Sequence, residues 1–482
     1  MIAGAAVAVL AVSWSGAAAS ELRLSTLANA SVALDDADNQ LNPYDYGENP
    51  AYLLLDYREP WIRFLFGIEE EKGDLKRAYE PHLTNDLYGG FEGIKKLGDR
   101  HVARGSVSYR RYMRRETPFN LEIDGYNDPF YLRDDTVGDF EYYGPSIHVD
   151  YGFRLRDDLH VGAGFDYDIG TDLKQEYTRP EIVHNNFRGN LGLLWEPRDR
   201  WMLGLVARPI RTQNRTTFAK TDEGFDNIFY SWYGEGIVEV RASSSFSIRE
   251  ILKGVDVGLQ QYYMGERFRF ALLADYTLEQ LKLQYNATRR DPKGFWQDET
   301  WDVKARARWR AGSLPLVLGV EGRFMKLDGW ARRPEYDDIL LFESPATLQS
   351  AGAGLTYRIT PLRLLASLEY VMNRWDIEAF DYGANDFREA EIVQNVGRLG
   401  LEYRVLNIYA IRGGAEVIDY PVDRWLEMPR NMDRYRFTGG FGYATGRWEI
   451  DAQFLYSMYT HDDYDTDRTG LSGIVWFTRF VD

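Results

Sequence analysis

The chain has 482 residues, with 57 Lys and Arg against 74 Asp and Glu, which gives a formal net charge of −17. The absence of cysteine excludes thiol catalysis, disulfide frameworks and Cys-ligated metal sites. The acidic balance argues against a nucleic-acid-binding protein, because such a protein needs a dominant basic face. Aromatic residues make up 15% of the chain and the mean hydropathy is −0.44. Beyond the N-terminus no run of about 18 apolar residues exists, so a bundle of membrane helices is excluded and a β-rich protein remains.

The N-terminus has the pattern of a targeting segment. Residues 2–14 are mostly apolar, and the small residues 16–19 follow them, as at a signal-peptidase site. We therefore expect residues 1–19 to be a cleaved signal peptide. Residues 20–60 are then an N-terminal extension or plug, and residues 61–482 form the main domain.

The body of the chain alternates with period two, which indicates β-strands with two different faces. Between residues 301 and 310 every odd position is apolar and every even position is charged. The alternation returns over residues 434–443 and 448–458. A soluble sandwich also alternates, so this pattern alone leaves a soluble β protein and a membrane barrel open.

Turns divide the chain into strands at regular intervals. Eight short polar turns alternate with nine longer polar connections, and together they join eighteen strands. Short turns on one side and long loops on the other are typical of outer-membrane barrels. We expect an all-β fold, a transmembrane antiparallel up-and-down β-barrel of about 18 strands within a range of 14 to 18. The short turns lie near residues 98–100, 156–158, 197–199, 265–267, 312–315, 360–361, 406–407 and 445–447, and the long connections near 69–86, 113–140, 170–183, 213–227, 287–299, 326–346, 374–392, 418–433 and 460–470.

Three segments leave the strand count open. Residues 228–263 are too long for one strand, and residues 268–286 fit either one bulged strand or two short ones. Residues 61–68 fit either the first strand or part of a plug. Because a bacterial barrel closes with an even number of strands, 16 and 18 are the main candidates and 14 is a third.

Aromatic residues gather near the short turns, on the apolar faces of their strands. This placement predicts an aromatic girdle at the inner membrane interface, where an amphipathic ring has one edge in hydrocarbon and one in water. The alternative is that these residues are core aromatics of a soluble β protein. The girdle residues are Trp195, Trp201, Trp309, Tyr357, Tyr403, Tyr443 and Trp448.

With a signal segment, alternating strands, a girdle and an aromatic last strand, the chain resembles the outer-membrane β-barrels of Gram-negative bacteria. More loosely, it resembles an uncharacterised barrel family of Bacteroidota. In the last strand Ile474, Trp476 and Phe480 share a face, and the resemblance implies recognition by the barrel-assembly machinery. It also implies residence in the bacterial outer membrane, in contact with its lipid.

A narrower resemblance lies ahead of the barrel, where the chain reads Asn49-Pro50-Ala51. Long-chain fatty-acid transporters carry an Asn-Pro-Ala segment near the mature N-terminus that leads into a hatch plugging the barrel. The resemblance implies that these three residues belong to a plug, and it adds a hydrophobic-ligand transporter as an option. The alternative is that Asn49-Pro50 is a turn before the first strand.

Motifs for catalysis and metal binding are sparse. His148 and Asp150, two residues apart on one strand face, are the one candidate for a base with an orienting carboxylate. No Gly-x-Ser-x-Gly sequence accompanies them, so we assign no catalytic residues. The six histidines lack the paired spacing of zinc sites, and the acidic run at residues 461–467 lacks the glycine and terminal Glu of a calcium loop. We expect no metal and no cofactor.

The polar faces of the strands predict a charged lumen of mixed sign. Such a surface either orients polar solutes in a channel or forms a salt-bridged filling, and the pattern leaves both open. The sequence thus favours a porin-like channel or transporter for small solutes. The second candidate is a structural or accessory barrel with a filled lumen in a larger assembly of envelope proteins, and the third is an outer-membrane hydrolase. The expected lumen residues are Arg104, Arg110, Arg154, Lys304, Arg306, Arg308, Arg323, Glu369, Glu402, Arg434, Arg436 and Asp451.

Overall fold

The structure is a computed structural model. It describes residues 43–44, 46–57, 59–76, 80–118, 130–134, 136–176, 178–218, 227–233, 237–243, 247–285, 291–312, 314–333, 339–359, 363–406, 408–419, 432–461 and 464–481. The expected signal peptide, residues 1–19, lies outside the described residues. Within these ranges no helix is both long and apolar enough to cross a membrane.

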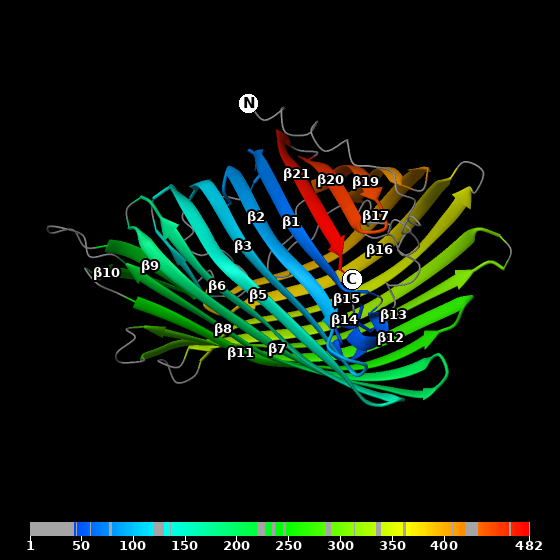
Figure 1. Cartoon of the computed structure of the whole chain (residues 1–482). Coiled ribbons are helices and arrows are strands. Elements are labelled where there is room, and N and C mark those ends of the chain that lie inside the picture. Colours follow the sequence, from blue (N-terminus) through cyan, green and yellow to red (C-terminus); the bar gives the residue numbers. More distant parts are fainter. Residues whose placement is uncertain are drawn as a thin grey trace.

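Eighteen antiparallel strands form one closed barrel (Figure 1). They follow one another around the barrel in chain order, and β1 pairs with β21 to close it, with Trp61 opposite Phe480. The prediction of an up-and-down barrel of 18 strands is therefore confirmed. The barrel strands are β1 (Trp61–Gly73), β2 (Leu83–Lys96), β3 (His101–Thr117), β5 (Gly138–Arg156), β6 (Leu159–Lys174), β7 (Pro180–Arg198), β8 (Trp201–Phe218), β11 (Ser247–Met264), β12 (Phe268–Tyr285), β13 (Asp291–Arg310), β14 (Leu316–Arg333), β15 (Ile339–Ile359), β16 (Leu364–Asp381), β17 (Asp386–Val405), β18 (Tyr409–Asp419), β19 (Met432–Ala444), β20 (Trp448–His461) and β21 (Tyr464–Phe480).

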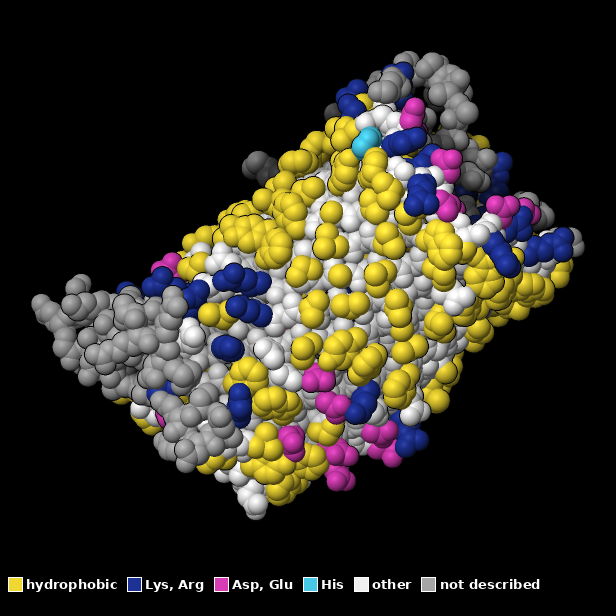
Figure 2. Space-filling view, turned by 90° about the horizontal axis from the view of Figure 1, so that it is seen from below, with side chains coloured by type: hydrophobic (Ala, Val, Ile, Leu, Met, Phe, Trp, Pro, Cys, Tyr) yellow, Lys and Arg dark blue, Asp and Glu magenta, His cyan; other side chains and the backbone are white. Residues whose placement is uncertain are grey.

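Strand β13 shows how the alternating sequence builds the barrel wall. Trp301 and Trp309 point outward and are 54% and 47% exposed, whereas the intervening Asp302 and Arg308 are 9% and 4% exposed. A cation facing lipid at the midplane costs about 2–4 kcal/mol, so the charged face turns inward. Figure 2 shows the resulting apolar band on one side of the barrel, with charged side chains gathered toward its rims.

Closure and the apolar band together place the protein in a membrane. Every barrel strand has two hydrogen-bonded neighbours, so no strand edge is left unpaired in hydrocarbon. An even number of antiparallel strands with an apolar outer face is the architecture of outer-membrane barrels. The chain is a transmembrane β-barrel of the bacterial outer membrane.

The eight short turns lie where the sequence predicts them, and all join strands at one end of the barrel, which we call the short-turn end. Most connections at the opposite, long-loop end are shorter than expected, whereas the one between β8 and β11 is longer. For example, the expected connection 374–392 is reduced to residues 382–385 between β16 and β17. The strands continue past the membrane, up to 21 residues in β15, although a bilayer needs only about 9–11. Beyond the membrane both strand faces meet water, so the alternation fades and the sequence resembles a loop.

Two of the long connections carry a second, smaller sheet. Strand β4 (Phe130–Arg133) lies between β3 and β5, and β9 (Asn227–Tyr233) and β10 (Ile237–Ser243) lie between β8 and β11. They pair in the order β10-β9-β4, outside the barrel ladder. This sheet resolves the ambiguous residues 228–263, which form a hairpin followed by β11.

The other two ambiguous segments are single strands. Residues 268–285 form β12, with a register shift against β13 between Leu283 and Gln284. Trp61 begins β1, so residues 61–68 belong to the barrel wall.

Candidate functional site

Charged side chains cover the inner wall in compensated sets. On β13 and β14, the Asp302 carboxylate accepts a hydrogen bond from Arg323 at 2.8 Å and lies 3.0 Å from Lys304 Nζ. On the same strands Arg306 donates to Glu321 at 2.6 Å. Cross-strand pairs of opposite sign stabilise a sheet and hold each cation in place.

A second compensated set lies on β17 to β20. Glu416 is 2% exposed, and its carboxylate accepts a hydrogen bond from Arg436 at 3.3 Å. Arg412 lies between Glu402 at 3.0 Å and Asp451 at 2.5 Å, and its side chain is fully buried. These guanidinium groups cross-link four neighbouring strands on the inner face of the barrel.

The structure places all twelve sequence-predicted lumen residues at inward positions of their strands, opposite exposed apolar neighbours. Their exposure differs strongly. Glu369 and Glu402 are 1% exposed, whereas the side chains of Arg110, Arg323 and Lys304 are 53%, 39% and 36% exposed. The lumen therefore has solvated charged stretches as well as closely packed ones. The twelve are Arg104, Arg110, Arg154, Lys304, Arg306, Arg308, Arg323, Glu369, Glu402, Arg434, Arg436 and Asp451.

Residues 43–44 and 46–57, which we call the luminal segment, lie inside the barrel near the short-turn end. Their apolar side chains share a buried cluster with inward side chains from the strand ends near the short turns. Two inward glycines make room for the segment: a Cβ added at Gly162 would lie 2.4 Å from Ala51 N, and one at Gly192 would lie 2.1 Å from Asn49 Oδ1. The cluster contains Tyr44, Ala51, Tyr52, Leu53, Leu54, Trp61, Ile94, Val102, Leu194, Met202, Tyr262, Ala271 and Leu273.

The Asn49-Pro50-Ala51 motif starts a short helix within the luminal segment. The Asn49 side chain accepts a hydrogen bond from Ala51 N at 3.0 Å and so caps the 3-10 helix η1 (Pro50–Tyr52), which runs into α1 (Leu53–Asp56). Proline suits the first helical position because its missing N–H would have no partner there. The Asn49 amide also donates to Leu193 O at 3.2 Å and to Gln260 Oε1 at 3.0 Å. Asn49 thus joins the helix start to the barrel wall.

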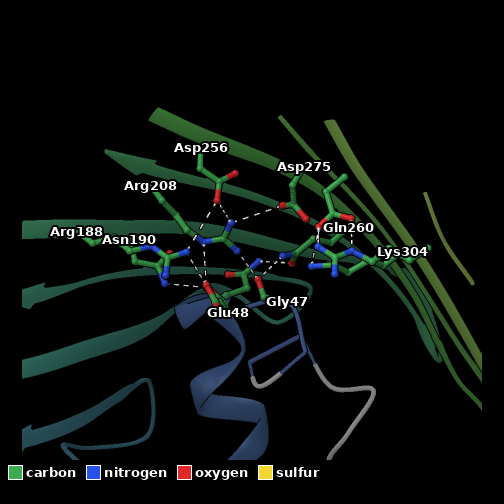
Figure 3. A network of polar contacts seen from close by, with 12 residues as sticks. Gly47, Glu48, Arg188, Asn190, Arg208, Asp256, Gln260, Asp275 and Lys304 are labelled. Atoms are coloured by element: carbon green, nitrogen blue, oxygen red, sulfur yellow. Dashed lines mark hydrogen bonds and ion pairs between the residues drawn. The ribbon is translucent and has the colours of Figure 1, made fainter. Parts of the chain in front are cut away.

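Arg208 on β8 is the main polar anchor of the luminal segment (Figure 3). Its side chain is 5% exposed, and it donates to Gly47 O at 2.7 Å. It also pairs with Asp256 at 2.7 Å and lies 3.5 Å from Asp275. Glu48 contacts the same guanidinium at 3.5 Å. One wall cation thus contacts two wall carboxylates and one from the segment.

The backbone of the luminal segment bends sharply at this anchor. Glu48 has a φ of 49°, a left-handed conformation that is uncommon for a residue other than glycine. The bend lets Arg188 reach the Glu48 carboxylate at 2.7 Å while Asn190 donates to Glu48 O at 2.8 Å. Nearby, burial raises the pKa of Tyr46 to about 12, although Arg306 lies over its ring at 4.9 Å and opposes this shift.

The small sheet narrows the long-loop end of the lumen. Lys174 on β6 is buried and donates to Asp134 Oδ2 at 2.6 Å and to Thr136 Oγ1 at 2.6 Å. Arg333 of β14 pairs with Glu239 of β10. An apolar cluster joins the small sheet to inward residues of the barrel. From the small sheet it contains Phe130, Leu132, Phe229 and Tyr233, and from the barrel it contains Phe140, Phe218, Ile248, Leu281, Leu283, Tyr285, Trp296, Ala331 and Leu341.

The expected girdle aromatics all lie close to short turns. Trp195, Trp201, Trp309, Tyr357 and Tyr403 are between 37% and 47% exposed on the outer face. The remaining two are less exposed because they contact aromatic neighbours: Trp448 lies 4.9 Å from the Phe477 ring, and Tyr443 lies 5.3 Å from the Tyr409 ring.

The last strand presents its aromatics differently from the rest of the wall. Ile474, Trp476 and Phe480 point into the lumen, where Phe480 packs against the cluster around the luminal segment. The outward face of β21 carries Leu471 and Phe477, 61% and 38% exposed.

Sequence reasoning missed the residues that hold the luminal segment. Arg208 and Gln260 were not singled out, because each looks like one more inward polar position on its strand. Arg412 was also missed, on a strand rich in glycine. The available signal is that Arg208, Asp256 and Asp275 all occupy inward positions on neighbouring strands, with Arg208 opposite Asp256. This pattern does not show that a segment binds there.

His148 is held as part of the wall. Its Nε2 lies 2.9 Å from Asp150 and its Nδ1 lies 2.6 Å from Asp166. Asp150 also accepts the Tyr44 hydroxyl at 2.8 Å. Because both ring nitrogens face carboxylates, neither is available to a substrate. In the described part of the chain no group of three or more His, Asp or Glu side chains has the arrangement of a metal site, and residues 462 and 463 of the acidic run lie outside that part.

Comparison with solved structures finds several barrels of low sequence identity. The siderophore receptor PiuA from Acinetobacter baumannii is 10% identical, with 86% of this chain and 81% of that chain covered and a TM-score of 0.44. OccAB3 from the same organism is 13% identical, with coverage of 87% and 99% and a TM-score of 0.39. The CymD monoaromatic hydrocarbon channel is 12% identical, with coverage of 92% and 94% and a TM-score of 0.34.

Sequence comparison identifies the family. A search of curated proteins finds no match. The family model described as "Family of unknown function (DUF6850)" matches residues 50–401, which begin within the luminal segment and continue through most of the barrel. The chain therefore belongs to this family.

Proposed function

We propose that the protein is an outer-membrane channel for small polar solutes, closed at its short-turn end by the luminal segment. The observation that carries this proposal is the solvation of charged side chains in the lumen. Arg110, Arg323 and Lys304 keep 53%, 39% and 36% of their side-chain surface exposed. A fully packed lumen would bury them, so their exposure supports a path that holds water.

The charge pattern favours polar over apolar solutes. Cations and carboxylates alternate around the wall, as in the Lys304–Asp302–Arg323 set. Opposed charges create a transverse field that orients dipolar or zwitterionic molecules. A hydrophobic ligand would have to displace water from these groups without replacing their hydrogen bonds, which is costly.

The luminal segment is suited to act as a movable gate. One of its polar contacts is partly hydrated, since the Glu48 and Arg188 side chains are 54% and 37% exposed, while the main anchor Arg208 is buried. Water can replace such contacts at modest cost. In this proposal residues 20–60 form the plug domain and residues 61–482 the channel.

Conductance in planar bilayers tests the proposal. We expect brief or small openings from the full chain, and large steady openings from a variant that lacks residues 20–57. Heat-modified migration on gels would show that both proteins are folded barrels. If neither protein conducts, the lumen is closed without the segment and the channel proposal fails.

A second candidate is an accessory barrel within an envelope assembly. The packing of the small sheet into the long-loop end, with Phe130 and Phe229 1% and 0% exposed, favours it because an apolar core narrows this end. Absence of conductance, together with co-purification of a stoichiometric envelope protein after crosslinking, would support this candidate.

A further inference from the structure

The outer face of β8, β11 and β12 carries five cations that have no carboxylate partner in the described part of the chain. No ion pair within the described residues involves any of these five side chains, which are named at the end of this paragraph. The Arg249 guanidinium donates to the neutral Gln213 side chain at 2.5 Å, and its Nε is buried without a partner. We call this group the basic patch: Arg211, Arg215, Arg249, Lys253 and Lys282.

The strand register places like charges of the basic patch directly opposite each other. Lys253 faces Arg211, and Arg249 faces Arg215. Lys282 flanks them, opposite the intervening Ile251. Like charges at facing positions destabilise a sheet, so this arrangement calls for anions from outside the chain.

The basic patch begins where the apolar band ends, on the long-loop side. The outward apolar run of β8 extends from Trp201 to Pro209, and Arg211 is the next outward residue. In β11 the outward apolar run ends at Val255, and Lys253 follows it toward the long loops. Runs of about 9–11 residues cross the hydrocarbon core, so the cations lie at headgroup level. Figure 2 shows Lys and Arg side chains gathered on the left, between the apolar band and the rim.

We propose that the basic patch binds a membrane lipid whose headgroup carries two phosphate groups, in the leaflet on the long-loop side. The two facing pairs are four residues apart along their strands, which corresponds to about 13 Å. Each pair can hold one phosphate, and guanidinium groups suit phosphate because they donate two parallel hydrogen bonds. The lipid's acyl chains would lie against the apolar band, near Val255 and Leu259, which are 39% and 64% exposed.

A lipid-binding titration tests this inference on the full chain in uncharged detergent. The probes are a fluorescent glycolipid with two phosphates and the same glycolipid without phosphates. We expect the phosphorylated lipid to bind more tightly. Two double variants, Arg211→Gln/Lys253→Gln and Arg215→Gln/Arg249→Gln, should each weaken the binding of the phosphorylated lipid about 25-fold, because each cation removed costs about fivefold in affinity.

The matched control is Arg111→Gln. Arg111 lies on the outer face of β3, next along that face from Tyr109, but it is paired with Glu141 at 2.6 Å. This variant should bind as the unmodified chain does. Because the substituted side chains lie on the outer face, all variants should keep the heat-modified migration of a folded barrel.

Three results would overturn the inference. The first is equal affinity for the two glycolipids, and the second is a loss in the Arg111 variant as large as in the double variants. The third is displacement of the lipid by inorganic phosphate at equal concentration, which would assign the basic patch to a free anion instead of a lipid. None of these results depends on whether the barrel conducts.

Discussion

Arg208→Met is the most direct test of how the luminal segment is held. Methionine keeps an unbranched apolar side chain at this position and removes the guanidinium group with its charge. The variant deletes the hydrogen bond to Gly47 O at 2.7 Å and the ion pair with Asp256 at 2.7 Å. It leaves Asp256, Asp275 and Glu48 without their shared cation.

The expected magnitude follows from the burial of these carboxylates. Removing one partner of a fully buried ion pair costs about 3–5 kcal/mol. Here Asp256 and Asp275 are 11% and 16% exposed and Glu48 is 54% exposed, so hydration compensates in part. We therefore expect Arg208→Met to weaken the docking of the luminal segment by about 2–3 kcal/mol, which lowers the docking equilibrium constant about 30- to 150-fold.

Amide hydrogen exchange measures this docking. The amide of Asn49 donates to Pro43 O at 2.9 Å and that of Tyr52 donates to Asn49 O at 3.1 Å. In the Arg208 variant both should lose about 30- to 150-fold of their protection, while the barrel amides keep theirs.

The matched control is Arg110→Met. Arg110 is also an inward arginine, and it pairs with Asp86 at 2.7 Å, away from the described residues of the luminal segment. Unchanged protection of Asn49 and Tyr52 in the Arg208 variant would refute the anchoring role. An equal loss in the Arg110 variant would show a general weakening of the barrel instead.

Three further predictions test the wall, the gate and the small sheet. Leu259 and Val240 are both 64% exposed, but only Leu259 faces lipid, so Leu259→Arg should lower the free energy of unfolding in vesicles by about 2–4 kcal/mol and Val240→Arg should change it little. Gly162→Ala places a methyl 2.4 Å from Ala51 N and should displace the luminal segment at a cost of about 1–3 kcal/mol. The open probability in bilayers should therefore rise. In the control variant Gly439→Ala the added methyl meets nothing within 4 Å, and this variant should conduct as the unmodified chain does. Asp134→Ala strips the buried Lys174 of its carboxylate and should speed hydrogen exchange in β4 and β9; unchanged exchange there would show that the apolar cluster alone holds the small sheet.

Local patterns in the sequence determined the barrel itself. A strand's side chains alternate between lipid and lumen, so residues 301–310 reveal both faces without any knowledge of neighbouring strands. Short turns carry their own polar and glycine signals, and all eight were therefore located. The inward positions of Arg306 and Arg436 follow from the same parity.

Tertiary structure alone decided how the luminal segment is held in the lumen. Arg208 meets Gly47 across 161 positions of sequence, and Asn49 meets Gln260 across 211, and neither contact has a period or spacing that a single sequence displays. The small sheet is hidden for the same reason, since β4 pairs with β9 across the whole of β5 to β8. A strand's two faces are set by its nearest neighbours along the chain, whereas the contents of a closed barrel are set by which distant residues the closure brings face to face.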